Sequence, residues 1–244
     1  MEAATSLQSP ITKNELRSYE KFIKKCEDNE RVERCRNKNI LRNGTVISEG
    51  KFWRCFVIAI LTTQTKSGKG SALEEFIKTK PNILNYKYCI KIEGKESIER
   101  EVTKGVTRFR ERACLYISEA IGKFKQGFWR DVKTQLKIIE TDTTLKKERE
   151  TSDFIRKNFK GVGRKQSRNI IQMMGLSKYV LPIDSRVVKK VEELSGITLN
   201  KKISGKDYLQ LEDRLQEICE SIGIYPCIFD ACAFNTQETT IYAD

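Results

Sequence analysis

Lys165 and Asp184, nineteen residues apart, are the two residues of this chain that are best placed for covalent chemistry. Lys165 follows the run Phe-Lys-Gly-Val-Gly-Arg and lies in the first turn of a predicted helix. The helix dipole and the neighbouring Arg164 both oppose protonation of its amine. A free lysine has a pKa of ~10.4, which must fall to about 7 for the amine to be a good nucleophile at neutral pH. Partial desolvation in a cleft would favour that fall, whereas a lysine considered alone is more simply a surface or phosphate-binding residue.

Asp184 has a structural explanation and a chemical one. It follows Leu-Pro-Ile and precedes the run Ser-Arg-Val-Val-Lys-Lys-Val, which is a predicted helix. An aspartate at this point is a good N-cap and stabilises a helix by about 1 kcal/mol. Chemistry requires more, because Lys165 and Asp184 must then face one cleft. A carboxylate in that place could help to deprotonate the lysine or stabilise a developing positive charge.

Two predicted helices joined by a tight turn must position Lys165. We expect the first over Thr151–Asn158, with Thr151 or Ser152 as its N-cap, and the second over Arg164–Met174. The preceding segment, residues 146–150, is rich in Lys and Glu, and its simplest interpretation is a solvated helix face.

The turn between these helices could hold a phosphate. Gly161 and Gly163 let the backbone turn tightly while Val162 packs inward. The amides of residues 161–164 would then point outward at a helix start, which favours a phosphate oxygen, and Lys160 and Arg164 add positive charge. These features predict a helix-hairpin-helix, a motif that grips the DNA backbone without reading its sequence. The alternative is a glycine turn that only packs two helices together.

The overall charge also points to a polyanion. The chain of 244 residues has 46 Lys and Arg against 33 Asp and Glu, a formal net charge of +13. Such an excess favours nucleic acid as a partner, with an acidic membrane surface or a merely solvated basic surface as alternatives. Hydrophobic residues make up 39%, which is enough for a folded interior.

The absence of histidine and the scattered cysteines exclude several kinds of catalytic and metal site. The chain has no histidine, so no His-based triad, His metal site or imidazole base can exist. Its eight cysteines are scattered, and the start Met-Glu-Ala-Ala-Thr-Ser lacks the basic head and apolar run of a signal peptide. We therefore expect reduced thiols in an intracellular protein, in the nucleoid and cytoplasm or in a eukaryotic nucleus.

Hydrophobic periodicity predicts an all-α fold. Helical spacing recurs over residues 16–26, 109–128 and 208–222, and the run 52–63 is apolar nearly all round, as in a central buried helix. Strand-like alternation is confined to short pieces at residues 45–47 and 88–92.

The hairpin and the aspartate together resemble a known family. The run Phe159-Lys-Gly-Val-Gly-Arg-Lys165, followed by Leu-Pro-Ile-Asp184, is similar to the helix-hairpin-helix DNA glycosylases, which include endonuclease III and the 8-oxoguanine DNA glycosylases. In the bifunctional members, the lysine that closes the hairpin attacks the sugar and the aspartate assists. The run Phe56-Val-Ile-Ala-Ile-Leu-Thr-Thr-Gln64 resembles the family's buried helix, which ends in a glutamine that fills the gap left by a flipped base.

The resemblance implies a mechanism and a set of roles. Lys165 and Asp184 would be catalytic, and Gln64, Lys160, Gly161, Val162, Gly163 and Arg164 would bind DNA. The enzyme would flip out a damaged base, cleave the glycosidic bond through a Schiff base on Lys165, and nick the strand by β-elimination. Its partner would be duplex DNA with a damaged base or an abasic site. The protein would be a monomer and would not associate with a membrane. The excised base stays open at this point.

The resemblance also implies a domain organisation and one departure from the family. A six-helix lobe would span residues 45–178, with the hairpin at about 151–175, and residues 1–44 plus 179–244 would form a second helical lobe across a cleft. Endonuclease III-like members often hold an iron–sulfur cluster with four cysteines near the C-terminus. This chain offers only Cys219, Cys227 and Cys232 there, so we expect no cluster, no metal and no cofactor.

Two other functions fit parts of the pattern. A non-catalytic helix-hairpin-helix module would bind DNA in a salt-dependent way without releasing a base. A monofunctional glycosylase would use water in place of the lysine. The combination of Lys165, Asp184 and Gln64 favours the bifunctional enzyme over both.

Overall fold

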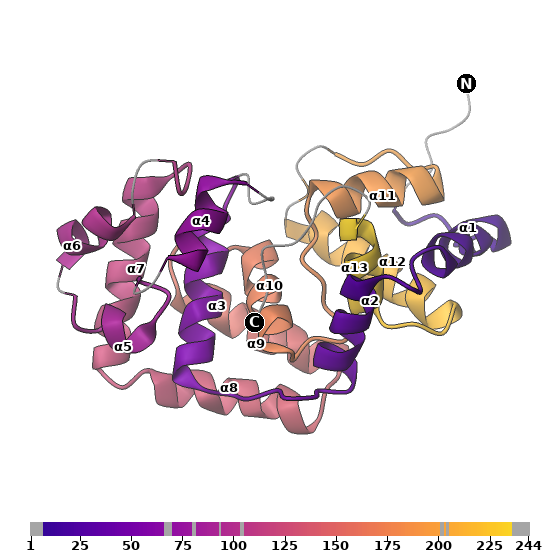
Figure 1. Ribbon diagram of the computed structural model, residues 1–244. Coiled ribbons are helices and arrows are strands. Elements are labelled where there is room, and N and C mark those ends of the chain that lie inside the picture. Colours follow the sequence, from indigo (N-terminus) through magenta and orange to yellow (C-terminus); the bar gives the residue numbers. More distant parts are fainter. Residues whose placement is uncertain are drawn as a thin grey trace.

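The computed structural model describes residues 7–65, 70–79, 82–92, 94–102, 105–200, 203 and 205–235. The first six residues, whose lack of signal-peptide features led us to expect an intracellular protein, lie outside this range. Residues 236–244 of the predicted second lobe also lie outside it. All regular elements within the described ranges are helical, which confirms the all-α prediction (Figure 1). None of these helices is long and apolar enough to cross a membrane.

The helices follow one another with short connections. In chain order they are α1 (Lys13–Lys24), α2 (Glu30–Cys35), the π-helical turn η1 (Arg36–Ile40), α3 (Glu49–Leu61), α4 (Ala72–Lys78), α5 (Tyr86–Cys89), α6 (Gly94–Glu101), α7 (Arg110–Lys125), α8 (Trp129–Thr141), α9 (Leu145–Asn158), α10 (Arg164–Met174), α11 (Ser185–Ser195), α12 (Gly205–Ser221) and α13 (Pro226–Asn235).

The strongly periodic segments form the predicted helices, and the weak ones do not form strands. The segments 16–26, 52–63, 109–128 and 208–222 correspond to α1, α3, α7 and α12. The piece at 45–47 is irregular, and the piece at 88–92 is largely the end of α5 and its turn. Within the described part of residues 45–178 there are eight helices, α3 to α10, rather than the six expected, because α4 and α5 are separate short helices.

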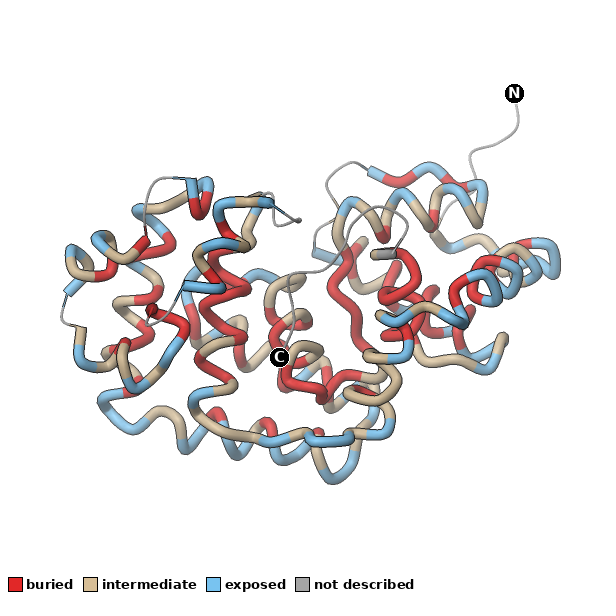
Figure 2. The backbone as a smooth tube through the Cα atoms, viewed as in Figure 1, coloured by how far each residue is buried: buried red, intermediate tan, exposed pale blue. Residues whose placement is uncertain are grey.

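The buried apolar side chains fall into two clusters. The first comes from residues 52–180 and surrounds α3, whose Phe52, Trp53 and Phe56 are fully buried. The second combines residues 19–32 near the N-terminus with residues 181–232, so both ends of the chain contribute to it. Figure 2 shows buried residues in both halves of the molecule, and those of α9 and α10, between the halves, belong to the first cluster. The boundary between the clusters falls at residues 180 and 181, between the helix of Lys165 and the helix that Asp184 begins.

Helix α9 is longer than the sequence suggested. It begins at Leu145, and its N-cap is Thr144, whose hydroxyl accepts a hydrogen bond from the amide of Lys147. The prediction of a start near Thr151 and Ser152 was wrong, since both are buried in the middle of the helix. The prediction of a solvated face over residues 146–150 was wrong at one position, because the side chain of Glu148 is fully buried.

Candidate active site

The turn between α9 and α10 is a helix-hairpin-helix. Val162 is buried between the helices, while Gly161 and Gly163 are exposed. Gly161 has φ +78°, and a Cβ atom there would lie 2.2 Å from the ring of Tyr116. Only glycine fits this position, because both the backbone conformation and the space exclude a side chain. Phe159, at the start of the turn, packs against Phe56 of α3 with ring centroids 5.1 Å apart, which fixes the hairpin to the first core.

The hairpin presents amides and cations at one helix start. Gly163 is the N-cap of α10 and has no side chain to accept hydrogen bonds from the first amides of that helix. Lys160 is 70% exposed and pairs with Glu119 at 2.8 Å, and Arg164 lies 3.5 Å from Asp153. A phosphate could therefore meet the first amides of α10 and two cations, each shared with one carboxylate, whereas the amide of Val162 already donates to the carbonyl of Phe159 at 3.3 Å.

Lys165 is the second residue of α10, and its half-buried side chain lines a pocket. Burial lowers the pKa of its amine, and the charge of Arg186 lowers it further. The carboxylates of Asp184 and Asp230 oppose this effect, but the net direction is downward. The amine therefore has a larger neutral, nucleophilic fraction than a solvated lysine.

Asp184 is the N-cap of α11, as its sequence position predicted. Its carboxylate accepts hydrogen bonds from the amides of Arg186, at 3.0 Å, and Val187, at 3.4 Å. The guanidinium of Arg186 folds back onto the same carboxylate, with Nε 3.1 Å from Oδ2. Burial raises the pKa of Asp184, but the hydrogen bonds and charge of Arg186, with the charge of Lys165, bring it below its usual value. The carboxylate is therefore ionised and interacts electrostatically with Lys165.

The pocket beside Lys165 is built from segments far apart in the chain. Its lining comes from α2, η1, α10, Pro182, α11 and α13, and thus from helices of both apolar clusters. Phe234 near the end of α13 is its aromatic element. The guanidinium groups of Arg31 and Arg186 lie 3.4 Å and 3.7 Å from the centroid of that ring, so cation–π contacts link α2, α13 and α11.

Asp230 of α13 is the carboxyl residue that lines the pocket. It is buried and accepts a hydrogen bond of 2.9 Å from Nε2 of Gln172 on α10. Burial raises its pKa, and the negative charge of Asp184 raises it further. Asp184 and Asp230 therefore differ, since the pKa of the first lies below its usual value and that of the second above it, a difference typical of sites with distinct acid–base roles.

Gln64 follows α3 in an exposed turn. Its φ is +50°, a left-handed conformation that residues other than glycine rarely adopt. Its neighbours are held from two sides: Thr63 Oγ1 accepts from Nε2 of Gln166 at 3.3 Å, and Thr65 Oγ1 accepts from the amide of Arg108 at 3.0 Å. Because Gln166 follows Lys165 directly, the turn of Gln64 lies beside the start of α10.

The three C-terminal cysteines are core residues. Cys219, Cys227 and Cys232 are buried, free thiols, and their pKa values are raised, for Cys219 and Cys232 chiefly by burial and for Cys227 by a hydrogen bond with Cys35 as well as burial. Among the described residues, no group of three or more His, Cys, Asp or Glu side chains is arranged to hold a metal ion.

Several pocket residues were not predicted from the sequence. The sequence gives one indication of a role for Arg186, which is its position two residues after the N-cap Asp184. That spacing allows the contact between the two side chains that the structure shows. Gln172, Asp230 and Phe234 carry no motif that identifies them. They become pocket residues only because α13 packs beside α2 and α10, through contacts between segments more than fifty residues apart.

Comparison with known proteins identifies the family. The family model of 8-oxoguanine DNA glycosylases matches residues 31–224. A curated relative, the 8-oxoguanine DNA glycosylase/AP lyase of Fusobacterium nucleatum subsp. nucleatum, is 26% identical over 123 residues. This match covers 49% of the chain and 52% of the relative, so it spans about half the length of that protein.

Solved structures share the fold at low sequence identity. The 8-oxoguanine glycosylase/lyase of Methanocaldococcus jannaschii, in complex with a 15mer DNA containing 8-oxoguanine, has a TM-score of 0.64 and 19% identity, covering 88% of this chain and 95% of that one. The 8-oxoguanine DNA glycosylase of Thermotoga maritima has a TM-score of 0.67 and 18% identity, covering 92% and 99%. The resemblance to helix-hairpin-helix glycosylases is thus confirmed, and the chain belongs to the 8-oxoguanine DNA glycosylase family.

Proposed function

We propose that this protein is a bifunctional DNA glycosylase and AP lyase that removes 8-oxoguanine from duplex DNA and then cuts the strand. The family match and the name of the curated relative support the substrate and the reaction type. One observation carries the chemistry: Lys165 is a half-buried amine of lowered pKa whose charge interacts with the ionised carboxylate of Asp184.

The hairpin would hold the DNA so that one nucleotide can leave the stack. The amides of Gly161, Gly163 and Arg164, with the side chains of Lys160 and Arg164, would bind a backbone phosphate, and the charge of +13 would attract the duplex. A base inside the duplex is out of reach, so the target nucleotide must be extruded. Gln64, on its exposed turn, would fill the vacated space and limit the loss of stacking.

The extruded base would enter the pocket beside Lys165. Asp230 with Gln172 offers hydrogen-bonding groups there, and the ring of Phe234, which lies between the guanidinium groups of Arg31 and Arg186, offers only its edge. Burial and the charge of Asp184 raise the pKa of Asp230, so this carboxyl group holds a proton more readily than a solvated aspartate does.

The chemical step uses the two catalytic residues in turn. The neutral amine of Lys165 attacks C1′, and the glycosidic bond breaks with its electron pair leaving on the base. The amine gives up two protons, one to the departing base and one to O4′, whose bond to C1′ breaks as the sugar ring opens, and this gives a Schiff base. Protonation of the Schiff base acidifies C2′, and as the C2′ proton is lost its electron pair forms the C2′=C3′ bond while the C3′–O bond breaks and the 3′ phosphate leaves. Asp184 would stabilise the cationic sugar and accept a proton.

Three further properties follow as proposals. Residues 45–178 would form one lobe and residues 1–44 with 179–244 the other, as the two apolar clusters suggest. The protein would act as a monomer. It would also work inside the cell, where its DNA substrate is found.

A panel of duplexes with single lesions tests the proposal. The protein should release 8-oxoguanine and cut the strand at the same site, and it should cut a preformed abasic site. Salt-dependent binding to all duplexes without base release would indicate a non-catalytic module. Base release without strand cutting would indicate a monofunctional enzyme.

A further inference from the structure

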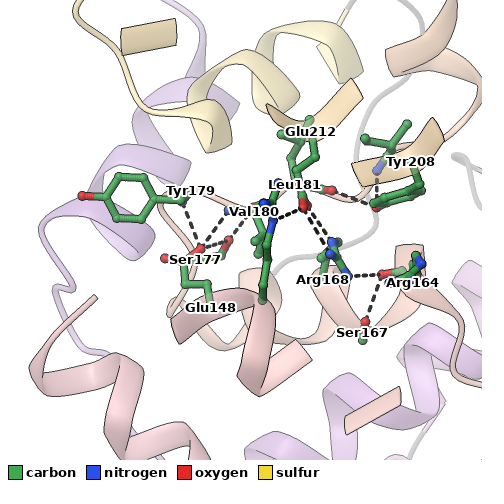
Figure 3. Close-up of polar contacts among 12 residues, drawn as sticks. Glu148, Arg164, Ser167, Arg168, Ser177, Tyr179, Val180, Leu181, Tyr208 and Glu212 are labelled. Atoms are coloured by element: carbon green, nitrogen blue, oxygen red, sulfur yellow. Dashed lines mark hydrogen bonds and ion pairs between the residues drawn. The ribbon is translucent and has the colours of Figure 1, made fainter. Parts of the chain in front are cut away.

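The segment that joins Lys165 to Asp184 is held by side chains rather than by regular structure. Residues 176–183 run from the end of α10 to the start of α11 without forming a helix. Six of these eight residues are nonetheless buried, so their backbone polar groups need partners. Figure 3 shows partners from α9 and α12 on two sides of the segment. In addition, Asn39 of η1 accepts from the amide of Ser177 at 3.1 Å, and the amide of Cys227 on α13 donates to the carbonyl of Lys178 at 3.2 Å.

Glu148 of α9 provides the first set of contacts. Its fully buried carboxylate accepts hydrogen bonds from the amides of Lys178 at 2.8 Å, Tyr179 at 3.0 Å and Val180 at 2.8 Å. The hydroxyl of Ser177 also lies 3.2 Å from this carboxylate, and the hydroxyl shares its one hydrogen with the carbonyl of Val180 at 2.6 Å. One side chain therefore fixes four consecutive residues, and no cation pairs with it among the described residues.

Tyr208 of α12 provides the second set. Its hydroxyl donates to the carbonyl of Leu181 and accepts from the amide of Ile183, each at 3.0 Å. The ring lies 5.0 Å from the guanidinium of Arg168, which pairs with buried Glu212 at 2.6 Å. The ion pair between α10 and α12 thus fixes the ring of Tyr208. Tyr208 in turn holds the amide of Ile183, the residue directly before Asp184.

The two sets of contacts span the whole connection between the catalytic residues. Lys165 is placed by α10, and Asp184 is placed by the backbone that leaves the segment at Ile183. If the segment moved, Asp184 would move relative to Lys165 without any change at the hairpin. A misplacement of about 1 Å at a reacting group can slow a reaction on the order of a hundredfold.

Resting on the proposed glycosylase function, we propose that Glu148 is a positioning residue. Its carboxylate holds residues 177–180 in the conformation that places Asp184 beside Lys165, and it touches neither DNA nor the reacting atoms. Tyr208 completes the same task at residues 181–183. The sequence offered no sign of this role, because Glu148 lies in a run of charged residues typical of a solvated face.

The test compares Glu148→Gln with a matched buried carboxylate. The amide group can accept through one atom only, so it cannot serve all four donors. At pH 8, above the pKa of about 7 for Glu148, we expect the single-turnover rate of base excision to fall about tenfold or more, while the Kd for duplex carrying an abasic-site analogue changes less than threefold. Hydrogen exchange should become faster in a peptide covering residues 176–183 and stay unchanged in the hairpin.

Glu15→Gln is the control. Glu15 is also buried and accepts two hydrogen bonds from Arg214, at 2.7 Å and 2.9 Å, but it does not contact the segment. It should lower the melting temperature and leave the excision rate of the folded protein unchanged. If Glu15→Gln slows excision as much as Glu148→Gln does, the effect is general destabilisation and the proposal is wrong.

Tyr208→Phe keeps the test decisive if Glu148→Gln fails to fold. It removes one hydroxyl and keeps the ring, and it should lower the excision rate several-fold with faster exchange at residues 181–183. Unchanged rate and exchange would overturn the positioning role. The two proposals can fail separately. A wild-type protein without any excision activity would contradict the proposed glycosylase function. Hydrogen exchange needs no substrate, so it would still test whether Glu148 and Tyr208 hold residues 176–183.

Discussion

The carboxylate of Asp184 is held by Arg186 in the free protein, with Arg186 Nε 3.1 Å from Asp184 Oδ2. The same guanidinium lies over the ring of Phe234 and lowers the pKa of Lys165. Arg186 therefore acts on both catalytic residues at once: it keeps the aspartate ionised, and it disfavours the protonated form of the lysine.

Replacing Arg186 by Gln should shift the pH dependence of catalysis. Loss of the guanidinium removes an influence that lowers the pKa of Lys165, so that pKa rises and a smaller fraction of the amine is neutral at pH 7. Of the carboxyl groups around the amine, Asp184 raises the pKa of Lys165, and Asp230 acts in the same direction. Single-turnover excision rates between pH 6 and 9 should show the acid limb moved to higher pH, with the rate recovering at alkaline pH. Lys189→Gln, the same charge change at an exposed position of α11, should leave the profile in place; a similar shift in both variants would contradict the local role of Arg186.

Gly161→Ala should weaken DNA binding. The new Cβ would meet the ring of Tyr116 at 2.2 Å in a left-handed backbone conformation, so the hairpin must change shape. We expect the affinity for undamaged duplex to fall about tenfold, in fluorescence anisotropy at fixed salt. Gly196→Ala is the matched control, because Gly196 has φ +65° but nothing within 4 Å. It should cost on the order of 1 kcal/mol of stability from backbone strain and leave DNA affinity unchanged.

The sequence predicted the elements that local chemistry determines. Gly161 and Gly163 mark the hairpin, Asp184 marks the start of α11, and the apolar run over residues 52–63 marks the central helix. It failed where a residue's environment is made by distant segments. Glu148 belongs by composition to a solvated face and is buried only because the segment 177–180 brings four donors to it. Phe234 joins the site only through the packing of α13 on α2.

Glu148 should make stability depend on pH in a way that Glu148→Gln abolishes. Burial raises the pKa of this carboxyl group from 4.5 to about 7, although its hydrogen bonds oppose the rise. Its titratable neighbours, Tyr179 and Cys227, stay neutral: burial raises the pKa of Tyr179, and a hydrogen bond with Cys35 raises that of Cys227. Between pH 4.5 and 7 the folded protein therefore keeps a proton that the unfolded chain has released, so stability falls as the pH rises.

Urea unfolding at pH 5 and pH 8 measures this effect. The free energy of unfolding of the wild type should fall between these values by about 3 kcal/mol more than that of Glu148→Gln. Equal pH dependence of the two proteins would show that the carboxyl group titrates near its usual value in the folded state.

Gln64→Ala should slow base release more than strand cutting. The side chain is exposed on a turn beside α10 and would fill the space left by an extruded nucleotide. Without it, extrusion from an intact pair becomes less favourable by roughly the stacking that is lost, a few kcal/mol at most. Excision from an 8-oxoguanine duplex should fall at least tenfold, while cleavage of a preformed abasic site should change little. Gln126→Ala, at an exposed position after α7, should affect neither reaction.

The central claim is that Lys165 forms a covalent bond to the sugar, and borohydride trapping tests it most directly. Incubation of the protein with an 8-oxoguanine duplex and sodium borohydride should yield a covalent protein–DNA adduct whose peptide map places the link at Lys165. Lys165→Gln should give no adduct and still bind the duplex. An adduct formed by Lys165→Gln, or strand cutting by the wild type with no adduct at all, would contradict the account.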